Sequence, residues 1–191
     1  DKVACIDPDK CISCGACVYQ CPFGAIQDKS YILDVVDLIK RSENNSKYKL
    51  YAVVAPSISS QFNYAKLGQV ISGLKELGFF HVVEAALGAD MVAYEEAKEL
   101  SEKGFLTSSC CPSFVDYIHK EFPNMVKHIS HNLSPMAVIS KYIKETDHNA
   151  KIVFIGPCTS KKVEFKKDNV KPWVDCVITF EELQALFDSK D

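Results

Sequence analysis

Four cysteines near the start of the chain form one short run, Cys11-x2-Cys14-x2-Cys17-x3-Cys21-Pro22. This spacing is that of thiolates that ligate a cubane 4Fe–4S cluster. A zinc site usually takes its ligands from two separated pairs, so a spaced triple followed by a prolyl cysteine favours iron and sulfide. Gly15 lies inside the run, where the backbone must approach inorganic sulfide and a side chain would interfere. We therefore expect Cys11, Cys14, Cys17 and Cys21 to bind iron.

The fourth ligand of this cluster stays open. In ferredoxins with two clusters, the last cysteine of such a run ligates the other cluster. Cys21 would then point away, and either Cys5 or a cysteine of a preceding run would complete the first cluster. Residues 1–28 resemble half of a ferredoxin fold, with one short strand expected at Lys2–Ile6 and a second after the turn that begins at Pro22.

The composition limits the cellular compartment and the kinds of binding partner that we expect. The 191 residues suffice for one domain and a small module. Nine cysteines in a ligand-type pattern indicate a reducing compartment, so we expect a cytoplasmic protein. The net charge of −3 gives no basic surface for a nucleic acid. No segment approaches the roughly 20 apolar residues of a membrane-spanning helix, so no membrane partner is expected.

Strands and helices alternate from Leu50 onward, which favours a parallel sheet with helices on its faces. We predict strands at Leu50–Ala55, Phe80–Ala85, Phe105–Thr107, Ile152–Ile155 and Val174–Phe180, and helices around residues 30–41, 64–77, 89–100, 112–122, 135–143 and 181–187. The fold class is therefore α/β: a ferredoxin-like 4Fe–4S module and connecting helix over residues 1–41, a polar linker, and a mostly parallel, helix-flanked sheet over residues 50–191.

Three of the predicted strands end in loops rich in reactive side chains. These loops are Ala55-Pro56-Ser57, Ser108-Ser109-Cys110-Cys111-Pro112 and Gly156-Pro157-Cys158-Thr159-Ser160-Lys161-Lys162. Parallel strands present such loops at one edge, outside which ligands bind. Helix starts beside Cys111 and Cys158 would favour the thiolate form. As an alternative, Cys110, Cys111 and Cys158 are small buried apolar residues.

The last two loops resemble the first and second signatures of the FeFe (iron-only) hydrogenases, in the same order and after a cysteine run. The resemblance implies a 4Fe–4S cubane bridged to a two-iron subsite, together called the H-cluster. By match, Cys111 and Cys158 would ligate the cubane, Cys110 would pass protons, and Lys161 would donate to a cyanide ligand. Pro56 and Ser57 would line the diatomic ligands. Glu96, Glu99 and Ser130 fall where the family's proton route runs, although solvated helix acids are an equally good interpretation.

The function implied is the reversible oxidation of H2 to protons and electrons, with ferredoxin or a similar carrier as electron partner. The alternative is a non-catalytic member of the same superfamily that acts in redox sensing, electron transfer or cluster assembly. A ferredoxin fused to a nucleotide-binding lobe would need a glycine-rich phosphate loop after a strand, and the sequence contains none.

Two residues depart from the family pattern, and one signature is missing. Gly156 replaces a frequent methionine, and Met136 follows Ser134-Pro135 where glutamine is common. The third signature, with two more cysteines, does not follow Cys158; Cys176 lies in an alternating strand pattern and is expected to be a core residue. We therefore expect the chain to be a fragment of a longer protein, and to be inactive alone. The five histidines show no ligand spacing and are expected on the surface or in packing.

Overall fold

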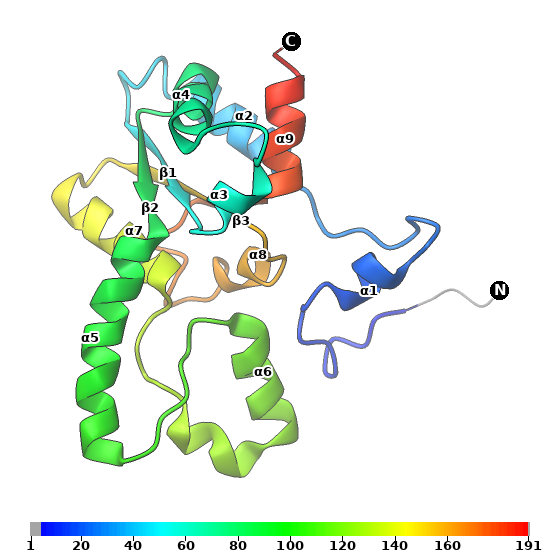
Figure 1. The fold of residues 1–191 in the computed structure, drawn as a ribbon, viewed down its shortest axis with the longest axis vertical. Helices are drawn as coiled ribbons and strands as arrows, with labels where there is room; N and C mark the ends of the chain where they lie inside the picture. Colours follow the sequence, from blue (N-terminus) through cyan, green and yellow to red (C-terminus); the bar gives the residue numbers. More distant parts are fainter. Residues whose placement is uncertain (1–4, 191) are drawn as a thin grey trace.

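A computed structural model describes residues 5–190. Its centre is a four-stranded, all-parallel sheet in the order β2-β1-β3-β4 (Figure 1). The strands are β1 (Leu50–Val54), β2 (His81–Glu84), β3 (Lys151–Gly156) and β4 (Cys176–Thr179). The predicted α/β class is confirmed. The chain passes from β1 to β2 at one edge of the sheet, then returns to β3 on the other side of β1 and continues to β4 at the opposite edge. The strand order therefore reverses between β1 and β3.

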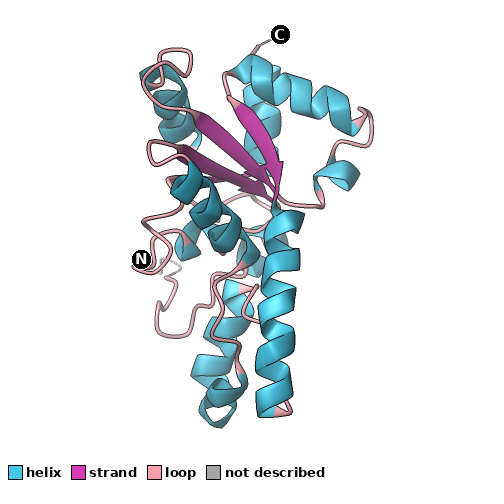
Figure 2. Ribbon diagram, turned by 90° about the vertical axis from the view of Figure 1, so that its left-hand side faces the viewer, coloured by secondary structure: helices cyan, strands magenta, loops and turns pink. Residues whose placement is uncertain are grey.

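Helices cover both faces of the sheet, which lies as one layer between them in Figure 2. One face carries α2 (Ile32–Arg41), α4 (Leu67–Leu77) and α9 (Phe180–Asp188), and the other carries α7 (Pro135–Thr146). The long helix α5 (Ala85–Lys103) packs on α7 and extends beyond the sheet. The remaining helices are α1 (Ala16–Gln20), α3 (Ile58–Gln61), α6 (Pro112–Glu121), η1 (Pro123–His128, a 3-10 helix) and α8 (Lys161–Glu164).

The core lies on the two faces of the sheet. Leu50, Ile152, Ile155, Ile178 and Leu183 are among its fully buried side chains. β3 and β4 are buried almost throughout, as expected for parallel strands whose two faces are both covered. Each fully buried aliphatic side chain contributes about 1.5–3 kcal/mol. This packing fixes the strand ends, and with them the loops that carry the cysteines.

Most of the helices and strands predicted from the sequence are found, including the helix α2 and the strands β1 and β3. Helices α4 and α5 end at Gly78 and Gly104, both left-handed (φ 118° and 74°). The strand predicted at Phe105–Thr107 is wrong: only one bridge forms, between Thr107 and Ile129, outside the sheet. The strand predicted after Pro22 is also wrong, since these residues form a turn and loop. Most of the strand predicted at Lys2–Ile6 lies outside the described residues.

Candidate iron–sulfur sites

The carboxyl ends of β1 and β3 meet where the strand order reverses. Ala55 donates its N–H to the Ile155 carbonyl at 2.8 Å, so the two strands stay paired up to their last residues. Directly beyond this pair lie Pro56 and Ser57 on one side and Pro157 and Cys158 on the other. Crevices outside such reversal points are the usual ligand sites of parallel sheets. The fold therefore places two of the predicted loops at one site.

Gly156, the last residue of β3, explains one departure from the family pattern. A Cβ at this position would lie 2.7 Å from the Phe154 ring and 3.2 Å from the Ala55 Cβ. A methionine there would displace the Phe154 side chain. Met136, the other departure, has its side chain buried in the core.

The loop after β3 contacts the loop that carries Cys110. Lys161 donates from Nζ to the Cys110 carbonyl at 2.9 Å, and its ammonium also pairs with Glu164 at 2.6 Å. The Cys158 thiol lies 2.8 Å from the Ser160 hydroxyl. Cys111 is the residue before α6, and Pro112 occupies the first helical position. The structure thus joins the two signature loops through Lys161, while the pairing of Cys111 with Cys158 on one cubane stays a prediction.

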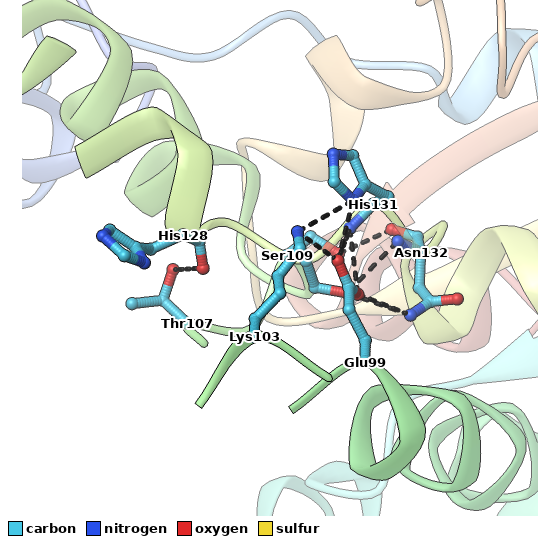
Figure 3. Close-up of polar contacts among 8 residues, drawn as sticks. Glu99, Lys103, Thr107, Ser109, His128, His131 and Asn132 are labelled. Carbon is cyan, nitrogen blue, oxygen red and sulfur yellow. Dashed lines mark hydrogen bonds and ion pairs between the residues drawn. The ribbon is translucent and has the colours of Figure 1, made fainter. Parts of the chain in front are cut away.

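A polar network holds the loop that precedes Cys110 (Figure 3). Thr107 donates to the His128 carbonyl at 2.7 Å and accepts from the Ser130 N–H at 2.8 Å. Ser109 donates from its hydroxyl to the Asn132 carbonyl at 2.6 Å. The residues before the two cysteines are therefore attached to the segment 128–132, which itself is held by Glu99 of α5.

The Glu99 carboxylate is the centre of this network. It pairs with Lys103 at 2.7 Å and with His131 Nδ1 at 2.7 Å, and accepts from the Ser130 hydroxyl at 3.0 Å. The Asn132 amide adds a donor at 3.3 Å. The Lys103 ammonium, with smaller effects of His131 and Ser130, lowers the pKa of Glu99 from 4.5 to about 2 against the opposing effect of burial. Two predicted proton-route residues, Glu99 and Ser130, are thus in direct contact.

Glu96, the third of these residues, lies one turn before Glu99 on α5. Its Oε1 is buried and has no hydrogen-bond partner within residues 5–190. No hydrogen bond joins Glu96 to Cys110 within residues 5–190, so its place in a proton route stays a prediction.

The first cysteine run packs beside the loop after β3. Cys11 and Cys17 line a cavity of about 200 Å³ together with Thr159 and Lys162. Cys14 lines a second cavity, of about 750 Å³, together with Cys158. The sequence reasoning did not anticipate this proximity of the first run to the second signature.

These cysteines fit the chemistry of an iron–sulfur ligand set. Cys11, Cys14, Cys17 and Cys21 are all free and none is buried. The Ser13 N–H lies 3.3 Å from the Cys11 sulfur, and backbone N–H groups of Phe23 and then Ala25 lower the pKa of Cys21. Within the described part of the chain, no three His, Cys, Asp or Glu side chains converge as ligands of a single ion. A cubane differs from a single ion because its irons occupy separate corners and its thiolates do not meet at one point.

Cys176 behaves differently from the other cysteines. Its side chain is 1 % exposed and belongs to the core, as the sequence predicts. Burial, helped by the nearby Asp34 carboxylate, raises the pKa of Cys176 to about 12. A thiol that resists ionisation in this way is a poor metal ligand.

Several residues of the site were missed by the sequence reasoning. Lys103 and His131 hold Glu99, and Lys162 forms buried ion pairs with Asp28 and Glu182. Lys162 lies inside the second signature beside Lys161, so the residue itself could be identified, but no sequence pattern reveals that its partner Asp28 lies 134 positions away.

Among residues 5–190, no helix has both the length and the apolar character that crossing a bilayer requires.

Comparison with known proteins agrees with the two parts of the site. Residues 48–191 match the family model for the iron only hydrogenase large subunit, C-terminal domain, and residues 4–27 match a 4Fe-4S binding domain.

Three relatives illustrate the range of the family. The chain is 28% identical to the NADP-reducing hydrogenase subunit HndD of Solidesulfovibrio fructosivorans, over 92% of the chain and 35% of that protein. It is 29% identical to Iron hydrogenase 1 of Clostridium pasteurianum, over 86% of the chain and 33% of that protein. It is 31% identical to the Cytosolic Fe-S cluster assembly factor NAR1 of Eremothecium gossypii, over 65% of the chain and 29% of that protein. The chain spans about a third of the length of these relatives, and it belongs to the iron-only hydrogenase large subunit family.

Proposed function

We propose that the whole protein is an FeFe hydrogenase, which interconverts H2 with protons and electrons. The observation that carries this proposal is the contact of Lys161 with the Cys110 carbonyl, at the point where the parallel sheet reverses its strand order. Two thiol-bearing loops that are far apart in the sequence are held together there. The family match and the hydrogenases among the relatives support the same function.

Each residue of the second site has a proposed role. Cys111 and Cys158 would hold the cubane of an H-cluster, which supplies the metal chemistry for H2 when it is bound. Lys161, oriented by its ion pair with Glu164, would donate hydrogen bonds to anionic ligands of that group. Pro56 and Ser57 would line the same crevice from the end of β1. Cys110 would carry protons to and from the reacting centre, because a thiol can both donate and accept them.

Electrons would pass through a 4Fe–4S cluster held by Cys11, Cys14, Cys17 and Cys21. Their exposure suits exchange with ferredoxin or a similar carrier at the surface. This proposal includes the division of the chain into a module over residues 1–41 and an α/β lobe over residues 50–191. It also includes a cytoplasmic location, which suits oxygen-sensitive thiolate ligands.

A non-catalytic role in cluster assembly or redox sensing is the second candidate, and one observation favours it. Proton transfer is most efficient when the pKa of the transferring group lies near the working pH. Glu99 is clamped by Lys103 and has a pKa of about 2, so it stays ionised near neutral pH. Such a carboxylate serves better as a structural anchor than as a proton carrier. The similarity to NAR1 points in the same direction.

Hydrogen production by the full-length, metal-loaded protein separates the two functions. With reduced methyl viologen as donor, a hydrogenase evolves H2, and Cys110→Ala abolishes this activity without changing the iron content. A fully loaded wild-type protein that evolves no H2 would support the non-catalytic role. Retention of activity by Cys110→Ala would remove Cys110 from the proposed proton route.

A further inference from the structure

Lys162 is the most completely enclosed charged side chain of the second signature, with 5% exposure. Its ammonium lies 2.6 Å from Asp28 Oδ2 and 2.6 Å from Glu182 Oε2, and donates to the Lys29 carbonyl at 3.1 Å. Three acceptors from two distant parts of the chain thus surround one cation. A buried ammonium is tolerated only when it is paired in this way. Lys162 therefore links the end of the cysteine module to α9.

Glu182 extends this link to the start of α2. Its Oε1 accepts the Tyr31 N–H at 3.0 Å, and its Oε2 accepts the Thr179 N–H at 2.7 Å. Although burial opposes ionisation, the Lys162 ammonium and these backbone donors lower the pKa of Glu182. The chain that follows the cysteine run is thereby fixed at Tyr31, the residue before α2, which packs against α9 and β4.

Thr159 provides a second attachment from the same segment. Its hydroxyl donates to the Ser13 carbonyl at 3.3 Å, inside the cysteine run. A Cβ on Gly15 would come within 2.8 Å of the Thr159 Oγ1, so the Thr159 side chain packs directly against the Gly15 backbone. Figure 1 shows α8, which begins just after this segment, on the side of the lobe that faces α1.

Residues of this segment thus contact two different loops. Thr159 and Lys162 hold the module, whereas Lys161 reaches the Cys110 carbonyl at 2.9 Å. Cys158, directly before Thr159 in the chain, lines one cavity with Cys14. The segment 158–162 therefore sets the distance between the first cysteine run and Cys158, the cysteine of the second signature.

We propose that Lys162 is a positioning residue, which fastens the Cys11–Cys21 module to the Cys158 loop and so sets the separation of the two iron–sulfur sites. This inference rests on the proposed function, because it requires both sites to hold iron and sulfide. When a single electron crosses between them, one site is oxidised and the other reduced. Lys162 exchanges no electron; it acts through geometry and through its positive charge, since it lines the cavity of Cys11 and Cys17.

The test compares Lys162→Met, Lys162→Arg and Asp28→Asn with Lys167→Met. Lys167 is a matched control because it belongs to the same stretch and pairs with Asp116 of α6 at 3.1 Å, away from the module. Each full-length protein is loaded with iron and sulfide under anaerobic conditions. Hydrogen exchange of peptides covering residues 5–31 reports the attachment, and a redox titration followed by EPR reports the potential of the first cluster.

Lys162→Met should speed exchange of these peptides by about ten-fold or more, because local opening becomes easier. It should also lower the midpoint potential, because a nearby positive charge that favours the reduced cluster is lost. Lys162→Arg should restore most of the potential, and Lys167→Met should change neither quantity. Asp28→Asn should speed exchange at residues 5–31, and its combination with Lys162→Met should add nothing further, since both remove one contact.

Two results would overturn the inference. The first is a Lys162→Met protein whose hydrogen-exchange rates and midpoint potential both equal those of the wild type. If Lys162→Met does not fold, the same comparison is made with Asp28→Asn, because the Asp28 side chain is 33% exposed and its replacement disturbs the core less. The second is an equal effect of Lys167→Met. A wild-type protein that takes up no cluster would instead refute the proposed function, so the two failures are distinguishable.

Discussion

Replacing Glu99 by glutamine removes the charge at the centre of the network that holds the Cys110 loop. Glutamine keeps the size of the side chain but has no charge, and an NH2 donor replaces one of the two carboxylate oxygens that accept from Lys103, His131 and Ser130. In the wild-type protein, the Glu99 carboxylate accepts from Lys103, His131 and Ser130 at 2.7, 2.7 and 3.0 Å. All of these contacts are weakened or lost at once, so segment 128–132 and the attached Thr107 and Ser109 should loosen.

The magnitude follows from the pKa of Glu99. A decrease from 4.5 to about 2 corresponds to at most about 3 kcal/mol of stability near neutral pH. Water screens part of this, because the His131 side chain is 80% exposed even though Glu99 is only 13% exposed. We therefore expect Glu99→Gln to lower the free energy of unfolding by about 1–2 kcal/mol. Glu95→Gln is the control, since Glu95 pairs only with Lys98 and both are 53% exposed.

Urea unfolding followed by circular dichroism measures the difference as a function of pH. Because the folded pKa is depressed, the contribution is fully present above about pH 4.5 and disappears as the pH falls toward about 2. Wild type and Glu99→Gln should therefore differ most near neutral pH and converge in acid. Equal stability of the two proteins at pH 7, or a difference that grows on acidification, would refute the role of Glu99 as an ionised anchor.

Two further predictions concern the core. In thermal melts, Gly88→Ala should destabilise the fold by about 1–3 kcal/mol, because its Cβ would collide with the Pro135 carbonyl oxygen and lie 3.0 Å from the Ile139 Cβ between α5 and α7. Gly68→Ala, whose Cβ would meet open space, is the control and should be neutral or slightly stabilising. Equal effects of the two substitutions would contradict the close packing of α5 on α7. In the native, cluster-free protein, iodoacetamide should modify the other eight cysteines before Cys176, which is 1% exposed and has a pKa of about 12; early labelling of Cys176 in peptide mass spectra would show that the thiol is accessible.

The sequence patterns that predicted the fold correctly are local ones. Short apolar runs such as Leu50–Val54 form buried strands, and Gly78 and Gly104 end helices because they adopt left-handed conformations without strain. Phe105–Thr107 failed because three strand-forming residues need a neighbour to pair with, and only Ile129 is available. Helix α5 begins earlier than predicted because Ala85-Ala86-Leu87 follows β2 without any residue that prevents a helix.

The site was predictable only where a motif carried it. The cysteine spacing and the Cys110 and Cys158 loops could be identified directly, because ligand geometry fixes the spacing of residues close in sequence. The contacts that attach these loops to the rest of the fold could not be identified in this way. Glu99 meets His131 across 32 positions, and Lys162 meets Asp28 across 134 positions, and such contacts depend on how helices pack rather than on any periodicity.

We propose that the first cysteine run holds a 4Fe–4S cluster against the loop of Cys158. Anaerobic reconstitution with iron and sulfide, followed by iron analysis and EPR of the reduced protein, tests it most directly. Cys14→Ala should lose about four irons per chain together with the EPR signal of the first cluster, whereas Cys176→Ala should keep both. Unchanged iron content and an unchanged signal in Cys14→Ala would contradict the claim.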